Sequence, residues 1–383
     1  MNNIIDYNKL KNARLYRGYT SEDIAKYIGI TRQAFSKYEN ENINLSLENV
    51  LKISEILHFP IDYFFQNEYE NSLEVKTTYF RSLLSTNKKA RNAQIAKMQY
   101  LSIYYSILSE YVEFPELNIL DDITTDNVEI ISSNLRNKWG LGNKPIKNII
   151  NIIERNGIIV TKYVTDTSNI DAFSTLIKLN DKKLYFIAIN KYTNSATRIH
   201  FDIAHELGHI LLDEWNEDIE NISREEFKNK EKRANEFASA FLLPADEFKK
   251  DVLLYPNNLD YYKELKKKWN VSISAMIYRA RTLEIITQYQ FQNLFRKMNY
   301  KNMLKEEPLD NILTTSEPSL LNDAIDILLD NDVFTKQELL DEFKNNGISM
   351  YREDIETILN LPENKLKPDE NERQKINIVK LRE

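Results

Sequence analysis

Three short runs of β-branched and aromatic residues, all between residues 157 and 190, constrain the fold of this chain most. The runs read GIIVTKYV, AFSTLIKL and KLYFIAIN, and polar turns such as NDKK separate them. Runs of this length and composition predict β-strands. Over most of the remaining chain the apolar residues recur at helical spacing. The sequence therefore predicts a mainly α-helical protein with a small β-sheet, of the α+β class.

The composition excludes several classes of protein. A chain of 383 residues exceeds one ordinary hydrophobic core, which predicts two or three domains. There is no cysteine, so disulfides, thiolate metal sites and cysteine nucleophiles are excluded. A net charge of −7 is not that of a general nucleic-acid binder. The first residues, MNNIIDYNKLKN, lack a signal-peptide pattern, and no stretch reaches the ~18–20 apolar residues of a membrane span. We therefore expect a soluble, cytoplasmic protein.

Patterns along the chain divide it into four segments. Residues 1–66 hold a series of short helical patterns. Residues 67–140 begin with a connector that lacks clear periodicity, 67–85, and continue into a long helix. Residues 141–298 hold the three predicted strands and several helices. Residues 299–383 are helical and polar, and their role is not indicated by the sequence.

The stretch AHELGHILLDEW, residues 204–215, predicts a metal site. On a helix, His205 and His209 lie about 40° apart around the axis and one turn apart, so both imidazoles can reach one ion. Glu206 points about 100° from His205, close to a water that the ion would hold. This is the geometry of the H-E-x-x-H zinc peptidases, in which the glutamate is the general base. The alternative is that this spacing of histidines arose by chance on an ordinary helix. A third ligand elsewhere in the sequence would favour the metal site.

The next helical pattern, KEKRANEFASAFLL, offers that third ligand. Glu231 and Asn235 share a helix face, so Glu231 can bind the ion while Asn235 fixes the tautomer of a ligand histidine. Glu236 is the competing ligand, on a different face from Asn235. We expect His200, five residues before His205, to be structural or at the surface, and His58 to be structural.

The run KLYFIAIN, residues 183–190, directly precedes the metal helix. In zinc peptidases an edge strand above the metal pairs with the extended substrate. Residues 183–190 are a candidate for that strand, and plain sheet packing is the alternative.

Residues 20–38 read as helix, turn and helix, with Thr20 and Thr31 as N-caps and a stop at Gly29. This spacing is typical of a helix-turn-helix, whose second helix enters the major groove of DNA. The exposed side chains of that helix would contact double-stranded DNA; they are Arg32, Gln33, Ser36 and Lys37. Arg32 and Gln33 suit base edges, and Lys37 suits phosphate.

A small protein-binding module is the alternative for residues 1–66. This segment has 8 Lys and Arg and 8 Asp and Glu, so its net charge is zero. A neutral module attracts phosphate only weakly, and a homodimer would compensate by doubling the contacts.

Two stretches resemble known families. ARLYRGYTSEDIAKYIGITRQAFSKYENE is similar to the phage-repressor-like (XRE) helix-turn-helix family. IAINKYTNSATRIHFDIAHELGHILL, with EKRANEFASAFLLP and WNVSISAMIYRARTLEII, resembles the ImmA/IrrE metallopeptidase family over about residues 145–298. That resemblance implies a zincin-like, gluzincin-type fold, with Zn²⁺ on His205, His209 and Glu231 and with Glu206 as general base. It also implies transcriptional repressors as substrates, in stress responses, mobile elements or defence.

Two functions are therefore open. In the first, a DNA-bound zinc metalloendopeptidase regulates transcription by cleaving a repressor or another regulatory protein. In the second, a non-proteolytic transcription regulator uses a peptidase-like domain to sense a signal or bind a partner. The complete H-E-x-x-H with a third carboxylate favours the first, and the fused DNA-binding segment keeps the second open. The sequence does not identify a residue that would stabilise an oxyanion.

Overall fold

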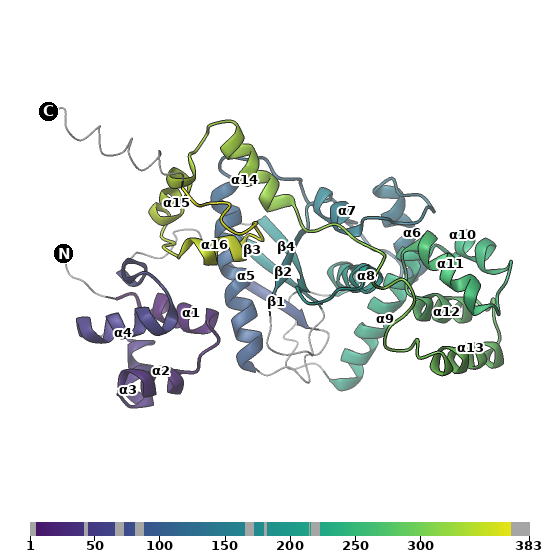
Figure 1. Cartoon of the computed structure of the whole chain (residues 1–383), viewed down its shortest axis with the longest axis horizontal. Coiled ribbons are helices and arrows are strands. Elements are labelled where there is room, and N and C mark those ends of the chain that lie inside the picture. The colour runs from purple at the N-terminus through teal and green to yellow at the C-terminus, as the bar shows by residue number, and fades with distance from the viewer. Residues whose placement is uncertain are drawn as a thin grey trace.

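The computed structural model combines sixteen α-helices with one small sheet within the residues that it describes (Figure 1). These residues are 5–41, 45–65, 73–80, 88–164, 172–179, 182–213, 215 and 223–368. The predicted α+β class is confirmed.

The N-terminal segment forms four helices and a 3₁₀ turn: α1 (Tyr7–Tyr16), α2 (Ser21–Ile28), α3 (Arg32–Tyr38), α4 (Leu47–Leu57) and η1 (Ile61–Phe65). The predicted caps of α2 and α3 are confirmed. Thr20 and Asp23 form a reciprocal capping box at the start of α2, and Thr31 caps α3. Gly29 ends α2 with a φ of 80°, a left-handed conformation that glycine adopts without steric cost. Local sequence thus fixes the angle between α2 and α3.

The sheet contains the three predicted strands, β2 (Ile159–Tyr163), β3 (Ala172–Leu179) and β4 (Lys182–Asn190), and a fourth, β1 (Leu73–Phe80). The strand order is β1-β3-β4-β2. Strands β3 and β4 form an antiparallel pair, β2 runs parallel to β4, and β1 runs antiparallel to β3.

Two expectations about strands were wrong. The segment 67–85 was expected to be only a connector, yet residues 73–80 within it form β1. Its partner β3 lies far along the chain, and strand formation depends on such partners more than on local pattern. Residues 183–190 were a candidate edge strand, yet β4 lies inside the sheet with β3 on one side and β2 on the other. Its backbone is therefore paired on both sides, so it cannot receive an extended substrate.

Alternating side chains of the strands divide the hydrophobic core into two clusters on the two faces of the sheet. On one face, Phe186 and Phe173 pack with α5 (Lys88–Leu108), with the N-terminal helices and with C-terminal residues. The C-terminal elements are α14 (Leu320–Asp330), α15 (Lys336–Asn345) and α16 (Arg352–Ile358). The helix-turn-helix segment therefore shares one continuous core with α5 and the C-terminal helices (Figure 1).

On the other face, Ile187 and Ile189 pack against α8 (Ala196–Leu212) and α9 (Arg224–Leu242). The remaining helices of this side are α6 (Val128–Lys138), α7 (Ile149–Arg155), α10 (Ala245–Val252), α11 (Leu259–Trp269), α12 (Ile273–Thr282) and α13 (Gln288–Tyr300). The two central helices, α8 and α9, carry the residues of the predicted metal site.

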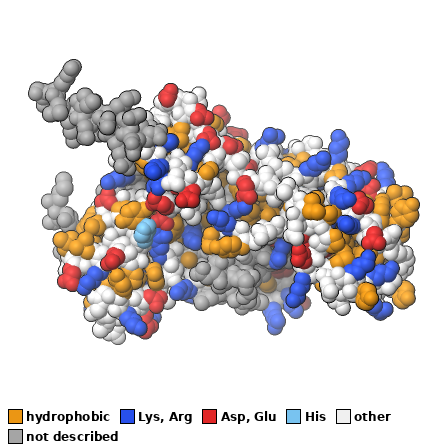
Figure 2. All heavy atoms as spheres, in the orientation of Figure 1, with side chains coloured by type: hydrophobic (Ala, Val, Ile, Leu, Met, Phe, Trp, Pro, Cys, Tyr) orange, Lys and Arg blue, Asp and Glu red, His pale blue; other side chains and the backbone are white. Residues whose placement is uncertain are grey.

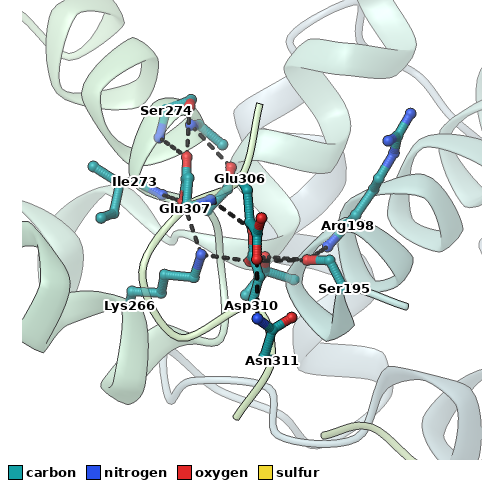
Figure 3. A network of polar contacts seen from close by, with 12 residues as sticks. Ser195, Arg198, Lys266, Ile273, Ser274, Glu306, Glu307, Asp310 and Asn311 are labelled. Atoms are coloured by element: carbon teal, nitrogen blue, oxygen red, sulfur yellow. Dashed lines mark hydrogen bonds and ion pairs between the residues drawn. The ribbon is translucent and has the colours of Figure 1, made fainter. Parts of the chain in front are cut away.

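A buried ion network joins the start of the C-terminal region to this second side (Figure 3). The ammonium group of Lys266, a fully buried residue, lies 2.9 Å from Glu307 Oε2 and 2.7 Å from Asp310 Oδ1. Glu307 also accepts hydrogen bonds from the first backbone N–H groups of α12, those of Ile273 and Ser274. Asp310 in turn accepts a 3.0 Å hydrogen bond from the hydroxyl of Ser195, the N-cap of α8. The segment around 307–310 therefore holds the beginning of α8.

A second set of polar contacts docks the helix-turn-helix segment on the C-terminal helices. The guanidinium of Arg17 forms two hydrogen bonds to the carboxylate of Asp354, at 2.7 and 2.5 Å. The ammonium of Lys344 lies 2.5 Å from Asp62. Because these bonds join residues far apart in sequence, the helix-turn-helix segment and the C-terminal helices meet in one interface.

Candidate functional site

Helices α8 and α9 bring three potential metal ligands together. His205 Nε2 and His209 Nε2 lie 3.1 Å apart on α8. From α9, Glu231 Oε1 lies 3.2 Å from His209 Nε2 and Oε2 lies 3.6 Å from His205 Nε2. The competing residue, Glu236, is instead half exposed and pairs with Lys232 at 3.7 Å. Among the described residues this is the group of histidines and carboxylates whose donor atoms could hold one metal ion.

These separations fit a tetrahedral ion. Ligand atoms at about 2.0–2.1 Å from a tetrahedral zinc ion lie roughly 3.3–3.4 Å from one another. The three observed separations, 3.1, 3.2 and 3.6 Å, span that value.

The other ring nitrogens of both histidines face acceptors. Nδ1 of His205 lies 3.1 Å from Asn235 Oδ1, and Nδ1 of His209 lies 2.6 Å from Asp213 Oδ2. The amide of Asn235 is itself oriented, because its Nδ2 donates to the carbonyl of Glu231 at 2.8 Å. An acceptor at Nδ1 places the proton there, which leaves the Nε2 lone pair for a metal ion.

The electrostatics of the cluster favour a positive charge at its centre. Burial alone would raise the pKa of Glu231, but its hydrogen bonds to His205 and His209 lower it to about 2. Burial alone would lower the pKa of His209, but its hydrogen bonds to Asp213 and Glu231 raise it to about 10. The carboxylates of Asp213 and Glu231 thus favour a positive charge between them. A proton on His209 supplies that charge here, and a bound metal cation could supply it instead.

Glu206 lies beside this cluster and is almost completely buried. Burial raises the pKa of its carboxyl group to about 7. Its Oε2 accepts a 2.6 Å hydrogen bond from the hydroxyl of Ser174, which projects from β3. A carboxyl group with a pKa near neutrality is suited to accept and return a proton.

Gly208 allows α8 and α9 to approach closely. A Cβ atom at this position would lie 3.1 Å from the Cα of Ala234 and 3.3 Å from a ring carbon of Phe237. Both contacts are tighter than normal packing, and the first is with backbone that cannot rotate away. The glycine between the two histidines therefore brings α9, and with it Glu231, within reach of them.

Sequence reasoning missed two partners of the site. Asp213 lies four residues after His209, within the stretch that defined the motif, and that spacing could have identified it. Ser174 lies on a strand far from the motif, and no local signal marks it. His200, expected to be structural or at the surface, is buried and lies 3.1 Å from the hydroxyl of Thr315. His58 is exposed and contacts Asp354.

The candidate DNA-binding residues lie on α3. Arg32, Gln33, Ser36 and Lys37 are all exposed, whereas Phe35 on the opposite side is buried in the core. Glu39, directly after α3, is buried and receives two hydrogen bonds from Arg14 of α1, at 2.6 and 3.1 Å. This pair fixes α3 against α1 with its polar face outward.

Comparisons with known proteins match both segments. Residues 10–64 match the family model described as helix-turn-helix, and residues 153–281 match the model described as IrrE N-terminal-like domain. The first segment is thus similar to helix-turn-helix domains, and the second is similar to IrrE N-terminal-like domains. The three clustered residues and Glu206 all lie inside the second match, and α3 lies inside the first.

A curated relative matches a short part of the chain. The chain is 36% identical over 55 residues to a SPbeta prophage-derived uncharacterized HTH-type transcriptional regulator, YonR, of Bacillus subtilis (strain 168). The match spans 14% of this chain and 51% of the relative, so about half of the relative's length is covered. Within the described residues, no helix combines the length and apolar character that crossing a membrane requires.

Proposed function

We propose that this chain is a DNA-binding zinc metalloendopeptidase that regulates transcription by cleaving a repressor or another regulatory protein. The observation that carries the proposal is the cluster of His205, His209 and Glu231, whose donor atoms lie within 4.8 Å of one another. Glu206 is buried beside that cluster, where a general base is required. The helix-turn-helix domain would bring the peptidase to the promoter at which its substrate is bound.

The residues of the chain have distinct roles in this proposal. Zn²⁺ bound by the two histidines and Glu231 would polarise the scissile carbonyl and increase the acidity of a water molecule. Glu206 takes the proton of the attacking water and returns it to the departing amide nitrogen. The hydroxyl of Ser174 orients the Glu206 carboxylate for both transfers. Asn235 and Asp213 keep the protons of the two imidazoles on Nδ1.

Metal analysis of the purified protein tests the centre. We expect about one zinc ion per chain, and we expect His205→Ala to lose it, because two remaining ligands bind zinc weakly. His58→Ala is the matched control, since His58 is exposed and distant in sequence from the cluster. Circular dichroism should show that all three proteins are folded. Folded wild-type protein that takes up no zinc when zinc is supplied would refute the proposed centre.

We propose further that α3 binds double-stranded operator DNA. Arg32 and Gln33, at the start of the exposed helix, would contact guanine and adenine edges, and Lys37 and Ser36 would contact the backbone. The domain would bind as a homodimer, which doubles the contacts of a module without net charge. Apolar side chains gather over α4 on the left of Figure 2, where Leu47 and Leu51 are exposed, and they offer a dimer surface.

Arg32→Ala combined with Gln33→Ala should weaken operator binding at least about thirtyfold, because each bidentate base contact contributes about 1–3 kcal/mol. Zinc content should not change. The operator would first be selected from random duplex DNA with the wild-type protein, and affinity would then be measured by fluorescence anisotropy at one fixed salt concentration. Lys250→Ala, on the surface of α10 and outside the helix-turn-helix domain, is the control. An unchanged DNA footprint for the double variant contradicts the assignment of α3.

A further inference from the structure

The outer edge of β3 is occupied by a strand from another part of the chain. Strands β2, β3 and β4 come from one continuous stretch, 159–190, and β3 would be an edge of their sheet. Strand β1 covers that edge in antiparallel pairing, and it belongs to the segment that joins the two domains. An extended peptide that adds to a sheet binds through such an edge.

Strand β3 is also the strand that contacts the candidate general base. The hydroxyl of Ser174 donates to Glu206 at 2.6 Å. In the ladder of β1 and β3, position 79 lies opposite Ser174, and positions 78 and 80 lie opposite Thr175 and Phe173. Neighbouring strands are about 4.8 Å apart. The backbone of residues 78–80 is therefore one strand spacing from the residue that orients Glu206.

From this arrangement we infer that β1 occupies the position of the substrate strand, and that the linker is an intramolecular substrate cut within residues 78–80. The inference rests on the peptidase function proposed above and gives that site a defined substrate. A free peptide that approaches Glu206 along β3 needs the same edge that β1 holds. The covalent connection keeps β1 next to the site at a high effective concentration.

The reaction is the hydrolysis of one peptide bond. The oxygen of a water molecule bonds to the carbonyl carbon within 78–80, and the bond from that carbon to the amide nitrogen breaks. Glu206 carries the proton of the water to the departing nitrogen. The products are a carboxylate at the end of the helix-turn-helix fragment and a new amino terminus on the peptidase fragment, and no other reactant is consumed.

The two fragments remain associated after this cut. The ion pairs of Arg17 with Asp354 and of Lys344 with Asp62 join the helix-turn-helix domain to helices beyond the cut site. The shared core also connects them. Cleavage therefore removes the covalent tether without separating the fragments at once, and it must be measured under denaturing conditions.

The test uses the full-length chain loaded with zinc and followed by mass spectrometry in denaturant. We expect two fragments that together weigh one water more than the intact chain, with a junction within 78–80. The rate constant should not change on dilution, because the reaction is intramolecular. Glu206→Gln should stay intact under the same conditions.

Two proline variants of β1 form a matched pair. Tyr79→Pro places proline at the ladder position opposite Ser174 and should slow the cut at least about tenfold. Lys76→Pro places it where the register shifts between Val75 and Thr77, at a residue without a partner in the ladder, and should be cut like the wild type. A synthetic peptide of residues 70–84, supplied to the wild-type protein, completes the set.

The outcomes separate this inference from the proposed function. If the zinc-loaded chain hydrolyses the peptide but stays intact itself, the peptidase function stands and the intramolecular substrate is refuted. Equal cutting of both proline variants, or a junction outside 78–80, also refutes it. If zinc is bound and neither the chain nor the peptide is hydrolysed, the intramolecular substrate is refuted, and the proposed function is then decided by whether Glu206→Gln changes regulation of the target promoter.

Discussion

Replacing Glu206 with glutamine should lower peptide hydrolysis by about 10²–10⁴-fold, the usual contribution of a general base, and leave zinc content unchanged. Zinc is retained because the three clustered ligands are His205, His209 and Glu231. Glutamine keeps the shape of the side chain and can still accept the hydrogen bond from Ser174, but it cannot take a proton from water. The rate at which the zinc-loaded chain is cut, followed by mass spectrometry with zinc measured in the same samples, provides the comparison.

The same variant distinguishes the two functional hypotheses in cells. If hydrolysis is the function, a reporter driven by the target promoter should respond to Glu206→Gln as it does to deletion of the protein. A variant that has lost hydrolysis and still regulates the reporter normally would show that the peptidase-like domain acts without cleavage. Ser174→Ala is a useful companion, because it removes only the hydrogen bond that orients Glu206 and should have a smaller effect.

Replacing Lys266 with methionine should lower the free energy of unfolding by about 3–5 kcal/mol, since removal of one partner leaves buried charges unpaired. The ammonium of Lys266 is bound to both Glu307 and Asp310, and the lysine is fully buried. Burial alone would raise the pKa of Asp310, yet its hydrogen bond with Lys266 keeps that pKa below its usual value. Urea unfolding of the variant and the wild type measures the difference.

Lys267 provides the control for this measurement. It is half exposed and pairs with Glu264 of the same helix, so Lys267→Met should change the unfolding free energy by less than about 1 kcal/mol. Adding Glu307→Gln and Asp310→Asn to Lys266→Met removes the two unpaired negative charges. The triple variant should therefore regain part of the lost free energy of unfolding. If Lys266→Met alone is as stable as the wild type, the ion network of Figure 3 does not stabilise the fold.

The parts of this molecule that local rules determine were predictable. The caps at Thr20 and Thr31 depend on residues three positions away, and the facing histidines of α8 depend on a spacing of four. The strands β2, β3 and β4 could be predicted from composition, because buried strands are nearly continuous runs of apolar residues. The placement of Glu231 next to the histidines followed from the helical spacing that it shares with Asn235.

Contacts between segments that are distant along the chain could not be predicted from the sequence. Strand β1 exists because β3 offers a partner, and Ser174 reaches Glu206 only when the sheet lies against α8. The C-terminal residues showed no chemistry in the sequence. Their carboxylates nevertheless bind Lys266, which lies 41 residues before Glu307, and Arg17, which lies 337 residues before Asp354. Charge pairing of this kind leaves no local pattern.

The docking of the helix-turn-helix domain on the last helices has a consequence for synthesis on the ribosome. Asp62 emerges long before its partner Lys344, and Arg17 before Asp354. At about 5–20 residues per second, the interval is on the order of tens of seconds. The domain therefore folds first without the surface that later covers it. A polypeptide released early therefore carries the helix-turn-helix domain without the C-terminal helices, and the polar face of α3 is exposed in it as in the complete chain. If α3 binds the operator as proposed, truncated translation products would compete with the complete protein for it.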